Sequence, residues 1–264
     1  MTEKNIKKYF DNISNSYDDN RYSDTADQWH AYFFSERLNI ARTFIKNKKG
    51  IILDIGSGPR FLLQEDINKE NKVIVSDISL NMIKLALSQA NSQTAINMLG
   101  GIELDTHLLP IKSMSIDIVV CLGVVTYLRS PDSAIVEMGR ILKKDGTLIL
   151  SLTNSVSPDT IIRKLFKKII KIIKPVFPKK LIGNRVLFQD FKVQSFTEKS
   201  IAAICSSCDL VVEDIRYFNY TFFPFNIIFK KLSLKLAAFL KHSSNKSHFV
   251  RRLASDMVVL ARKR

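Results

Sequence analysis

Asp54-Ile-Gly-Ser-Gly58 follows directly after the apolar run Ile51-Ile-Leu53. A short apolar, β-branched run that ends in a glycine turn predicts a buried parallel strand whose carboxyl end opens on a ligand crevice. Gly56 and Gly58 lack a Cβ, so the turn can take positive φ and approach a ligand closely. We expect its N–H groups to point outward, ahead of a helix near Pro59. Asp54 places a carboxylate at the mouth of the crevice, where it suits an ammonium group.

The next strand also ends in an acid. Val73-Ile-Val75 leads to Asp77, and an acid at the end of the second strand is placed to accept both hydroxyls of a ribose. A nicotinamide cofactor would require a third glycine at position 61, where the chain has Phe61. The pattern therefore predicts a nucleoside half-site without a pyrophosphate cradle.

Three downstream segments extend the pattern. Leu109-Pro110, the strand-like run 115–120 and the segment 137–150 follow at the spacing of the next two βα units. With them, residues 9–153 resemble the class I S-adenosylmethionine-dependent methyltransferases, in particular the small-molecule branch that includes the ubiquinone and menaquinone methyltransferases. The resemblance implies an α/β, Rossmann-like seven-stranded fold and S-adenosylmethionine as the cofactor.

The resemblance also implies roles for individual residues. Asp54, with the turn residues Gly56, Ser57 and Gly58, matches the family's first motif, and Asp77 matches its ribose acid. Ile78 and Met82 would flank the adenine, Asp105 in Asp105-Thr-His-Leu-Leu-Pro110 would accept its amino group, and Leu122 would line the same site. Leu142-Lys-Lys-Asp-Gly146 matches the family's Leu-Lys-Pro-Gly-Gly turn, with Lys144-Asp145 in place of Pro-Gly. Arg60 stands where the family often has a third glycine, which keeps open a relative that does not catalyse.

Length and composition favour one elaborated domain. The chain has 264 residues, 46% of them hydrophobic, enough to bury one substantial α/β core. We expect a helical cap over 1–48, a cofactor-binding core over 49–154, a basic insertion over 155–196 and the end of the fold over 197–264. The first residues lack an apolar leader segment and no apolar run is long enough to span a bilayer, so we expect a cytoplasmic protein.

The cysteines predict neither a disulfide framework nor a metal site. Their number, three, is odd, and Cys205-Ser-Ser-Cys208 has no second pair and no nearby histidine to complete a metal or redox centre. We therefore interpret this pair as structural and expect no bound metal. Cys121, which follows Val120 rather than proline, is interpreted as a core residue and not as the nucleophile of carbon-5 pyrimidine methylation.

The positive charge is confined to one half of the chain. Residues 1–154 carry 18 Lys or Arg and 18 Asp or Glu, whereas residues 155–264 carry 22 and 7. A neutral catalytic half joined to a basic half predicts a docking surface.

The rest of the sequence predicts a helical cap and the strands of the sheet. A helical stretch from about Thr25 to Lys46 resembles the cap that closes over the cofactor in this family. Tyr17 is the candidate contact there, with packing of the cap on the core as the alternative. Strands are expected at 51–54, 72–77, 101–105, 116–121, 147–152, 210–217 and 256–261, and residues 95–99 compete for the third strand.

The clearest surface element is a helix over Ile161–Lys174, which Pro175 ends. At about 100° per residue, eight aliphatic or aromatic side chains occupy one half of the circumference and six basic ones occupy the other. Those basic residues are Arg163, Lys164, Lys167, Lys168, Lys171 and Lys174. Such a helix is suited to the inner face of a membrane. The alternative is that its apolar side packs on the protein's own core.

A second cluster is aromatic. Tyr217–Phe225 contains six aromatic residues in nine, and it is followed by a basic, apolar stretch over 226–241. Aromatic residues beside lysines are typical of membrane interfaces. They could equally line a pocket for an apolar substrate.

Methyl transfer requires alignment more than a covalent nucleophile, although a hydroxyl acceptor benefits from a base. The weak candidates are His30, in the cap, and Tyr127, after the fourth strand; His107 is assigned to the cofactor side. The favoured function is transfer of a methyl group to an oxygen atom, with carbon ranked second, of a small lipid-soluble or lipid-linked acceptor at the membrane surface. The alternatives are an RNA methyltransferase that uses the basic half, and a non-catalytic membrane module. The acceptor and the oligomeric state are not encoded in any motif.

Overall fold

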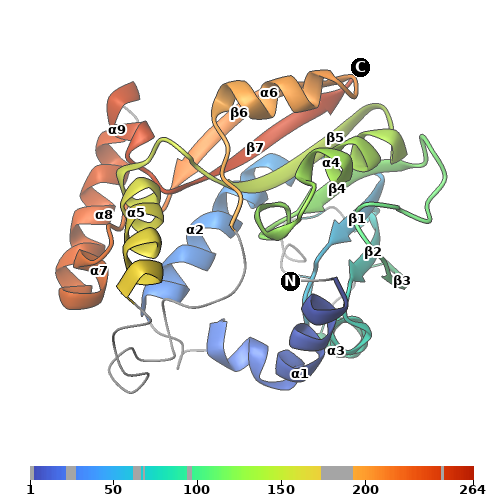
Figure 1. Cartoon of the computed structure of the whole chain (residues 1–264). Coiled ribbons are helices and arrows are strands. Elements are labelled where there is room, and N and C mark those ends of the chain that lie inside the picture. The colour runs from blue at the N-terminus through green and yellow to red at the C-terminus, as the bar shows by residue number, and fades with distance from the viewer. Residues whose placement is uncertain are drawn as a thin grey trace.

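The computed structural model describes residues 3–21, 28–61, 67, 69–93, 97–173, 193–244 and 247–264. Within these ranges a single seven-stranded sheet runs in the order β3-β2-β1-β4-β5-β7-β6 (Figure 1). Its strands are β1 (Ile51–Ile55), β2 (Lys72–Asp77), β3 (Asn97–Glu103), β4 (Ile116–Cys121), β5 (Leu142–Thr153), β6 (Leu210–Phe218) and β7 (Asp256–Lys263). Only β7 runs antiparallel to its two neighbours. The order reverses between β1 and β4, which is where α/β sheets bind ligands.

The helices lie on both faces of this sheet. They are α1 (Glu3–Arg21), α2 (Gln28–Ile45), α3 (Leu80–Gln93), α4 (Pro131–Ile141), α5 (Pro158–Ile173), α6 (Glu198–Ser206), α7 (Phe225–Ile228), α8 (Lys230–Ser244) and α9 (His248–Arg252), with one 3-10 turn, η1 (Val125–Tyr127). Helices α5, α7, α8 and α9 gather at the left of the view in Figure 1, and α1 and α3 lie side by side below β1, β2 and β3. None of the described helices has the length and apolar character needed to cross a bilayer.

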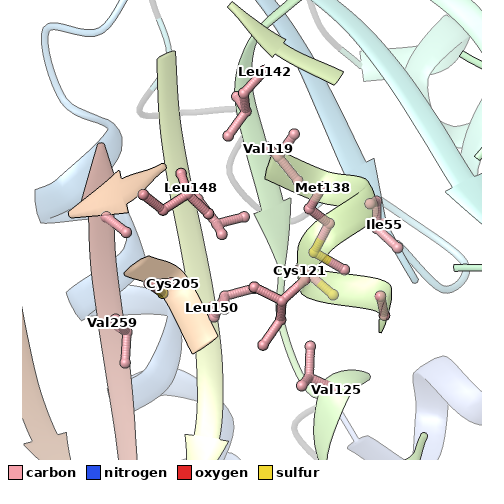
Figure 2. Close-up of a cluster of buried hydrophobic side chains, with 14 of the residues drawn as sticks. Ile55, Val119, Cys121, Val125, Met138, Leu142, Leu148, Leu150, Cys205 and Val259 are labelled. Atoms are coloured by element: carbon pink, nitrogen blue, oxygen red, sulfur yellow. The ribbon is translucent and has the colours of Figure 1, made fainter. Parts of the chain in front are cut away.

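Alternation along the strands divides the core into two layers. One layer combines Leu53, Val119 and Leu148 with the apolar faces of α4 and α6, and it contains Cys121 and Cys205 (Figure 2). The other layer combines Ile52, Val120, Ile149 and Val258 with α2 and α3. Because side chains two residues apart share a face, Asp54 and Asp256 point to the α2 side of the sheet.

The structure confirms most of the predicted elements and corrects several of them. The third strand begins at Asn97, so it includes part of the competing stretch 95–99. Residues 56–60 form turns and a bend, so the helix expected at Pro59 does not start there, and 62–66 lie outside the described residues. All three cysteines are buried and free, as the structural interpretation required of Cys121, Cys205 and Cys208.

The aromatic segment is largely internal. Phe218, Tyr220 and Phe223 are buried, and Tyr220 packs with Ala237 of α8 and Ala254. The prediction that these side chains lie at a membrane interface is therefore wrong for these three aromatics. The burial of Tyr220 packs α8 against the segment that precedes β7.

Helix α5 begins earlier than expected and contains an acid. Asp159, in its first turn, is buried and accepts hydrogen bonds from the Phe223 N–H at 2.6 Å, the Ser255 hydroxyl at 3.2 Å and Arg163 Nε at 2.7 Å. The basic face of the predicted helix is thus neutralised at Arg163. The side chains of 167–173, and all of 174–192, lie outside the described part of the chain.

Candidate active site

The ends of the strands carry a polar layer above the α2-side core. Asp54 follows Ile52 on β1, Ser151 follows Ile149 on β5, and Asp256 precedes Val258 on β7. All three therefore lie on the same side of the sheet, beyond its last apolar layer. The Ser151 hydroxyl accepts a hydrogen bond from the Gly123 N–H at 2.7 Å, which holds the chain after β4 against the end of β5.

The glycine turn is stabilised by the end of the second strand. The N–H groups of Gly56 and Ser57 donate to the Ser76 carbonyl at 2.8 and 3.0 Å, so they do not point outward as the sequence suggested. Gly56 has φ of 71° and a Cβ there would lie 2.2 Å from Val124 Cγ2. Its role is close packing, because no other residue leaves room for Val124.

Gly58 faces a more open space. Its φ is 64°, and a Cβ there would meet only Tyr17 Cε1, at 3.9 Å. The structure thus brings Tyr17 of α1 beside the glycine turn, as expected of a contact from the cap. Ser57, in contrast, is buried.

Asp77 is held in place by backbone donors. Its Oδ2 accepts from the Gly58 N–H at 3.1 Å and its Oδ1 from the Ser79 N–H at 2.9 Å. Each carboxylate oxygen has a second lone pair, so the group keeps acceptor capacity for a ribose. The Ser79 hydroxyl donates to Asp11 of α1 at 2.6 Å, which ties the cap to this corner. Burial raises the pKa of Asp77 to about 6, against the lowering effect of the N–H donors.

Asp54 stands opposite a buried arginine that sequence reasoning missed. Burial, reinforced by the nearby Asp77 carboxylate, raises the pKa of Asp54 to about 7, and Arg37 opposes that rise. Arg37 is itself buried on α2, and a Cβ on Gly123 would lie 2.4 Å from its Nη1. Its Nε has no hydrogen-bond partner in the part of the chain that the structure describes. The guanidinium lies over the rings of Phe33 and Phe34, at 5.6 and 4.7 Å from their centroids. A carboxylate and a guanidinium in one region match the two charged ends of an amino-acid zwitterion.

The remaining predicted cofactor residues differ in their exposure to solvent. Ile78 and Leu122 are partly exposed, whereas Met82, in the first turn of α3, is buried. Asp105 has a 40% exposed side chain and accepts from the His107 N–H at 2.9 Å, with the His107 ring 2.8 Å from the same oxygen. His107 therefore belongs to the Asp105 side, as expected.

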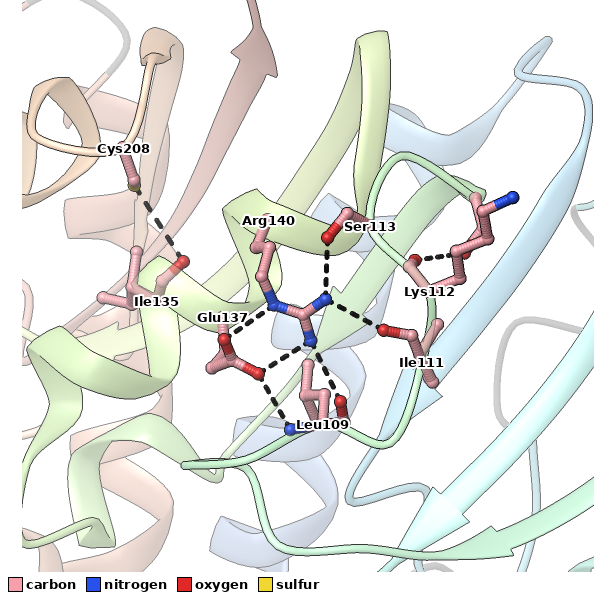
Figure 3. A network of polar contacts seen from close by, with 9 residues as sticks. Leu109, Ile111, Lys112, Ser113, Ile135, Glu137, Arg140 and Cys208 are labelled. Carbon is pink, nitrogen blue, oxygen red and sulfur yellow. Dashed lines mark hydrogen bonds and ion pairs between the residues drawn. The ribbon is translucent and has the colours of Figure 1, made fainter.

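The segment after Asp105 is fixed by an ion pair on α4 (Figure 3). Arg140 donates to the carbonyls of Leu109 and Ile111, each at 2.9 Å, and to Glu137. Glu137 in turn accepts the Leu109 N–H at 2.9 Å. These contacts orient the loop that leads from β3 to β4, and with it the position of Asp105.

Three titratable side chains are candidates for a base. His30 lies two helical turns before Arg37 on α2 and stacks on Phe34, with ring centroids 6.5 Å apart. Tyr127, on η1, is 41% exposed. Asp256, which no sequence motif had indicated, accepts from Asn219 Nδ2 at 2.8 Å and from the Thr153 hydroxyl at 3.2 Å. Burial raises the pKa of Asp256 to about 6.

Comparison with known proteins identifies the core of this chain. Residues 53–150 match a family described as a methyltransferase domain. An uncharacterised protein of Methanocaldococcus jannaschii is 26% identical over 178 residues, which cover 66% of this chain and 62% of that protein. The chain thus spans less than two thirds of the length of that relative.

Solved structures share the fold at low sequence identity. The magnesium protoporphyrin IX methyltransferase of Synechocystis, solved with bound S-adenosylhomocysteine, superposes with a TM-score of 0.64 at 16% identity and full coverage of both chains. A S-adenosylmethionine-dependent methyltransferase of Thermotoga maritima gives a TM-score of 0.59 at 15% identity, over 98% of this chain and all of the other. These likenesses establish the Rossmann-like methyltransferase architecture.

Proposed function

We propose that this protein, whose residues 53–150 match a methyltransferase-domain family, transfers the methyl group of S-adenosylmethionine to an oxygen atom of a lipid-soluble or lipid-linked acceptor at a membrane surface. The observation that carries the cofactor assignment is the presence of two buried, oppositely charged side chains, Asp54 on β1 and Arg37 on α2. Asp54 would hold the ammonium group of the cofactor, and the guanidinium of Arg37 would hold the carboxylate.

The neighbouring strand ends would hold the rest of the cofactor. Asp77 keeps lone pairs for the ribose hydroxyls after accepting two backbone N–H groups. Asp105 would accept the adenine amino group from its exposed position, and Ile78 and Tyr17 would line the site. The bound cofactor supplies a methyl carbon on a sulfonium, which is already a good leaving group. The chain's own task is to orient that carbon and exclude water.

We assign the acceptor-side proton to Asp256 first, with His30 and Tyr127 as the other candidates. A base works best when its pKa lies near the working pH, and burial moves the pKa of Asp256 in that direction, to about 6. Asn219 and Thr153 orient its two oxygens. A hydroxyl acceptor hydrogen-bonded to Asp256 would lose its proton to that carboxylate as the new carbon–oxygen bond forms.

Membrane contact is supported by the start of α5. Ile161, Ile162 and Leu165 are exposed, which does not favour packing of these side chains on the protein's own core. Phe166 differs from them, because its ring packs edge-on against the buried Phe223, with centroids 5.0 Å apart. Lysines beside exposed apolar side chains are suited to anionic lipid. The same exposure supports a lipid acceptor over RNA, because phosphate binding needs no apolar surface.

The cofactor site is tested by calorimetry with S-adenosylhomocysteine. We expect binding by the wild type, none by Asp77→Ala, and unchanged binding by Asp132→Asn, an exposed acid on α4. If the wild type released no heat with S-adenosylhomocysteine, the result would exclude the proposed enzymatic function and favour a non-catalytic module.

The acceptor class is tested with S-adenosylmethionine carrying a tritiated methyl group, added to a membrane lipid extract or to total RNA. We expect the label in the lipid fraction. Alkali or acid should release the label if the product is a methyl ester and should leave it in place if the product is a methyl ether. Label in RNA alone would overturn the acceptor class while leaving the cofactor assignment intact.

The role of α5 is tested by sedimentation with anionic vesicles. The variant Lys164/Lys167/Lys168/Lys171→Glu should lose vesicle binding. Its control is Lys46/Lys72/Lys112/Lys144→Glu, four lysines that are exposed in the neutral half. Equal binding by both variants would exclude α5 from the membrane contact.

A further inference from the structure

Helix α8 presents its large apolar side chains to solvent and its small ones to the protein. Ser233 and Ala237 are 2% and 0% exposed, whereas Leu232 and Phe239 are 56% and 66% exposed. Leu236, which is also exposed, lies between them on the same face, since the spacing 232, 236, 239 follows successive helical turns. This is the reverse of the usual pattern for a helix on a water-facing surface.

The exposed stripe continues beyond α8. Ile228 and Phe229 precede it at the end of α7, and Phe249 on α9 is exposed as well. We call Ile228, Phe229, Leu232, Leu236 and Phe239 the α8 face. A contiguous apolar surface of this kind marks an interaction site, because single exposed apolar residues are common but clusters are not.

The charges on α8 itself are of one sign. Lys230, Lys231 and Lys235 are all exposed, and Lys235 lies within one turn of both Leu232 and Phe239. No acidic residue occurs between Asp214 and Asp256, whereas eight Lys or Arg residues do. A protein partner would bring charges of both signs, but an anionic bilayer is complementary to uniform positive charge beside an apolar stripe.

The α8 face is connected to the cofactor site through α2. Lys241 of α8 forms an ion pair with Glu36 at 2.5 Å, and Glu36 precedes Arg37, the arginine beside Asp54. Tyr32 of α2 also packs on the cluster of Tyr220 and Ala237. A membrane that binds the α8 face would therefore lie next to the helix that forms one wall of the active-site cleft.

We propose that the α8 face is a docking surface for an anionic lipid bilayer, which places the cleft next to acceptors dissolved in that bilayer. The proposal rests on the membrane-surface function above and adds a second contact to that of α5. Phe239 and Leu232 would enter the apolar part of the interface, and Lys231 and Lys235 would reach the headgroups.

The test is flotation with vesicles of phosphatidylcholine containing phosphatidylglycerol, compared with phosphatidylcholine alone. Wild type should bind the anionic vesicles. Leu232→Asn/Phe239→Asn should weaken this binding at least tenfold, as should Lys231→Ser/Lys235→Ser. The matched controls Leu99→Asn and Lys144→Ser change exposed residues of β3 and β5 and should bind as the wild type does.

The outcomes separate this inference from the proposed function. If both α8 variants bind like the wild type while Leu165→Asn on α5 does not, the α8 face is excluded and the membrane function stands. If the wild type binds neither vesicle, the membrane context falls, but S-adenosylhomocysteine binding by calorimetry still reports the cofactor site. Binding of RNA in place of vesicles, lost in the lysine variant and kept in the apolar variant, would overturn the lipid assignment.

Discussion

The cofactor half and the basic half of this chain place their decisive residues in opposite environments. In residues 1–154 charges balance and the important acids, Asp54 and Asp77, are buried at strand ends. In residues 155–264 the excess charge is positive and the conspicuous apolar side chains, such as Leu232 and Phe239, are exposed. Burial of the acids suits the enclosure of a small ligand, and we propose that the exposed apolar side chains of the second half contact a membrane surface.

Asp256 is the exception that joins the two halves. It comes from the basic half, but it is placed at the same sheet edge as Asp54 because β7 runs antiparallel and begins where β5 ends. The Arg37 guanidinium lowers the pKa of both carboxyl groups, against the larger effect of burial. The acceptor chemistry is therefore expected where the second half reaches back into the cleft of the first.

The largest expected effect comes from removing the carboxylate of Asp256. Asp256→Asn should slow methyl transfer to the lipid extract by about 10²–10⁴-fold, the usual contribution of a general base. At saturating cofactor the rate of the wild type should fall below pH of about 6, where Asp256 takes up a proton, and the variant should lack this acidic limb. Cofactor affinity should not change. A variant that keeps the limb would exclude Asp256 as the group that titrates.

A second effect should be confined to the cofactor half. Asp54→Asn and Arg37→Gln should each weaken S-adenosylhomocysteine binding by about 2–5 kcal/mol, because each leaves a ligand charge without its buried partner. Neither should alter the affinity for 5′-methylthioadenosine, which lacks the amino-acid part. Equal losses for both ligands would mean that the pair supports the fold of the site and does not contact the amino acid.

Much of the cofactor half could be predicted because its signals are local. Ile51–Ile55 and Lys72–Asp77 are continuous apolar runs that end in an acid, and both form strands that end at the cleft. Strand β3 was less well bounded because its residues alternate between partial and full exposure at the edge of the sheet, where burial imposes little on the sequence.

Arg37 and Asp256 could not be found from the sequence for a different reason. Arg37 lies in a helix with no motif around it. Its proposed role depends on Gly123 and Asp54, which are near it in the fold but distant in the chain. Asp256 gains its position from the antiparallel pairing of Thr153 with β7. The aromatic run 217–225 misled because its composition suits both an interface and a core, and only tertiary packing decides between them.

The glycine turn offers a test within the cofactor half. Gly56→Ala should lower the free energy of unfolding by roughly 3 kcal/mol, since positive φ costs 1–2 kcal/mol and the clash with Val124 adds to it. Gly58→Ala should cost only about 1 kcal/mol, because its φ is similar but the nearest atom would lie 3.9 Å away. Urea denaturation measures both. Equal losses would contradict the packing role of Gly56.

The smallest effect is the pH dependence of cofactor binding, which should be a property of the cofactor half alone. The pKa of Asp54 is raised from 3.8 to about 7 in the folded protein. The contribution of Asp54 to the stability of the ligand-free protein therefore falls as the pH rises from about 3.8 to about 7. The ammonium group of the ligand requires the ionised form. S-adenosylhomocysteine affinity should therefore fall by up to about tenfold per unit as pH drops below 7, and more steeply below about 6 as Asp77 takes up a proton. Calorimetry between pH 7 and 6 should show a constant affinity for Asp54→Asn, whereas the affinity of Asp256→Asn should follow that of the wild type. If the affinity of Asp54→Asn still depends on pH, the titrating group is another residue and the ammonium site loses its electrostatic basis.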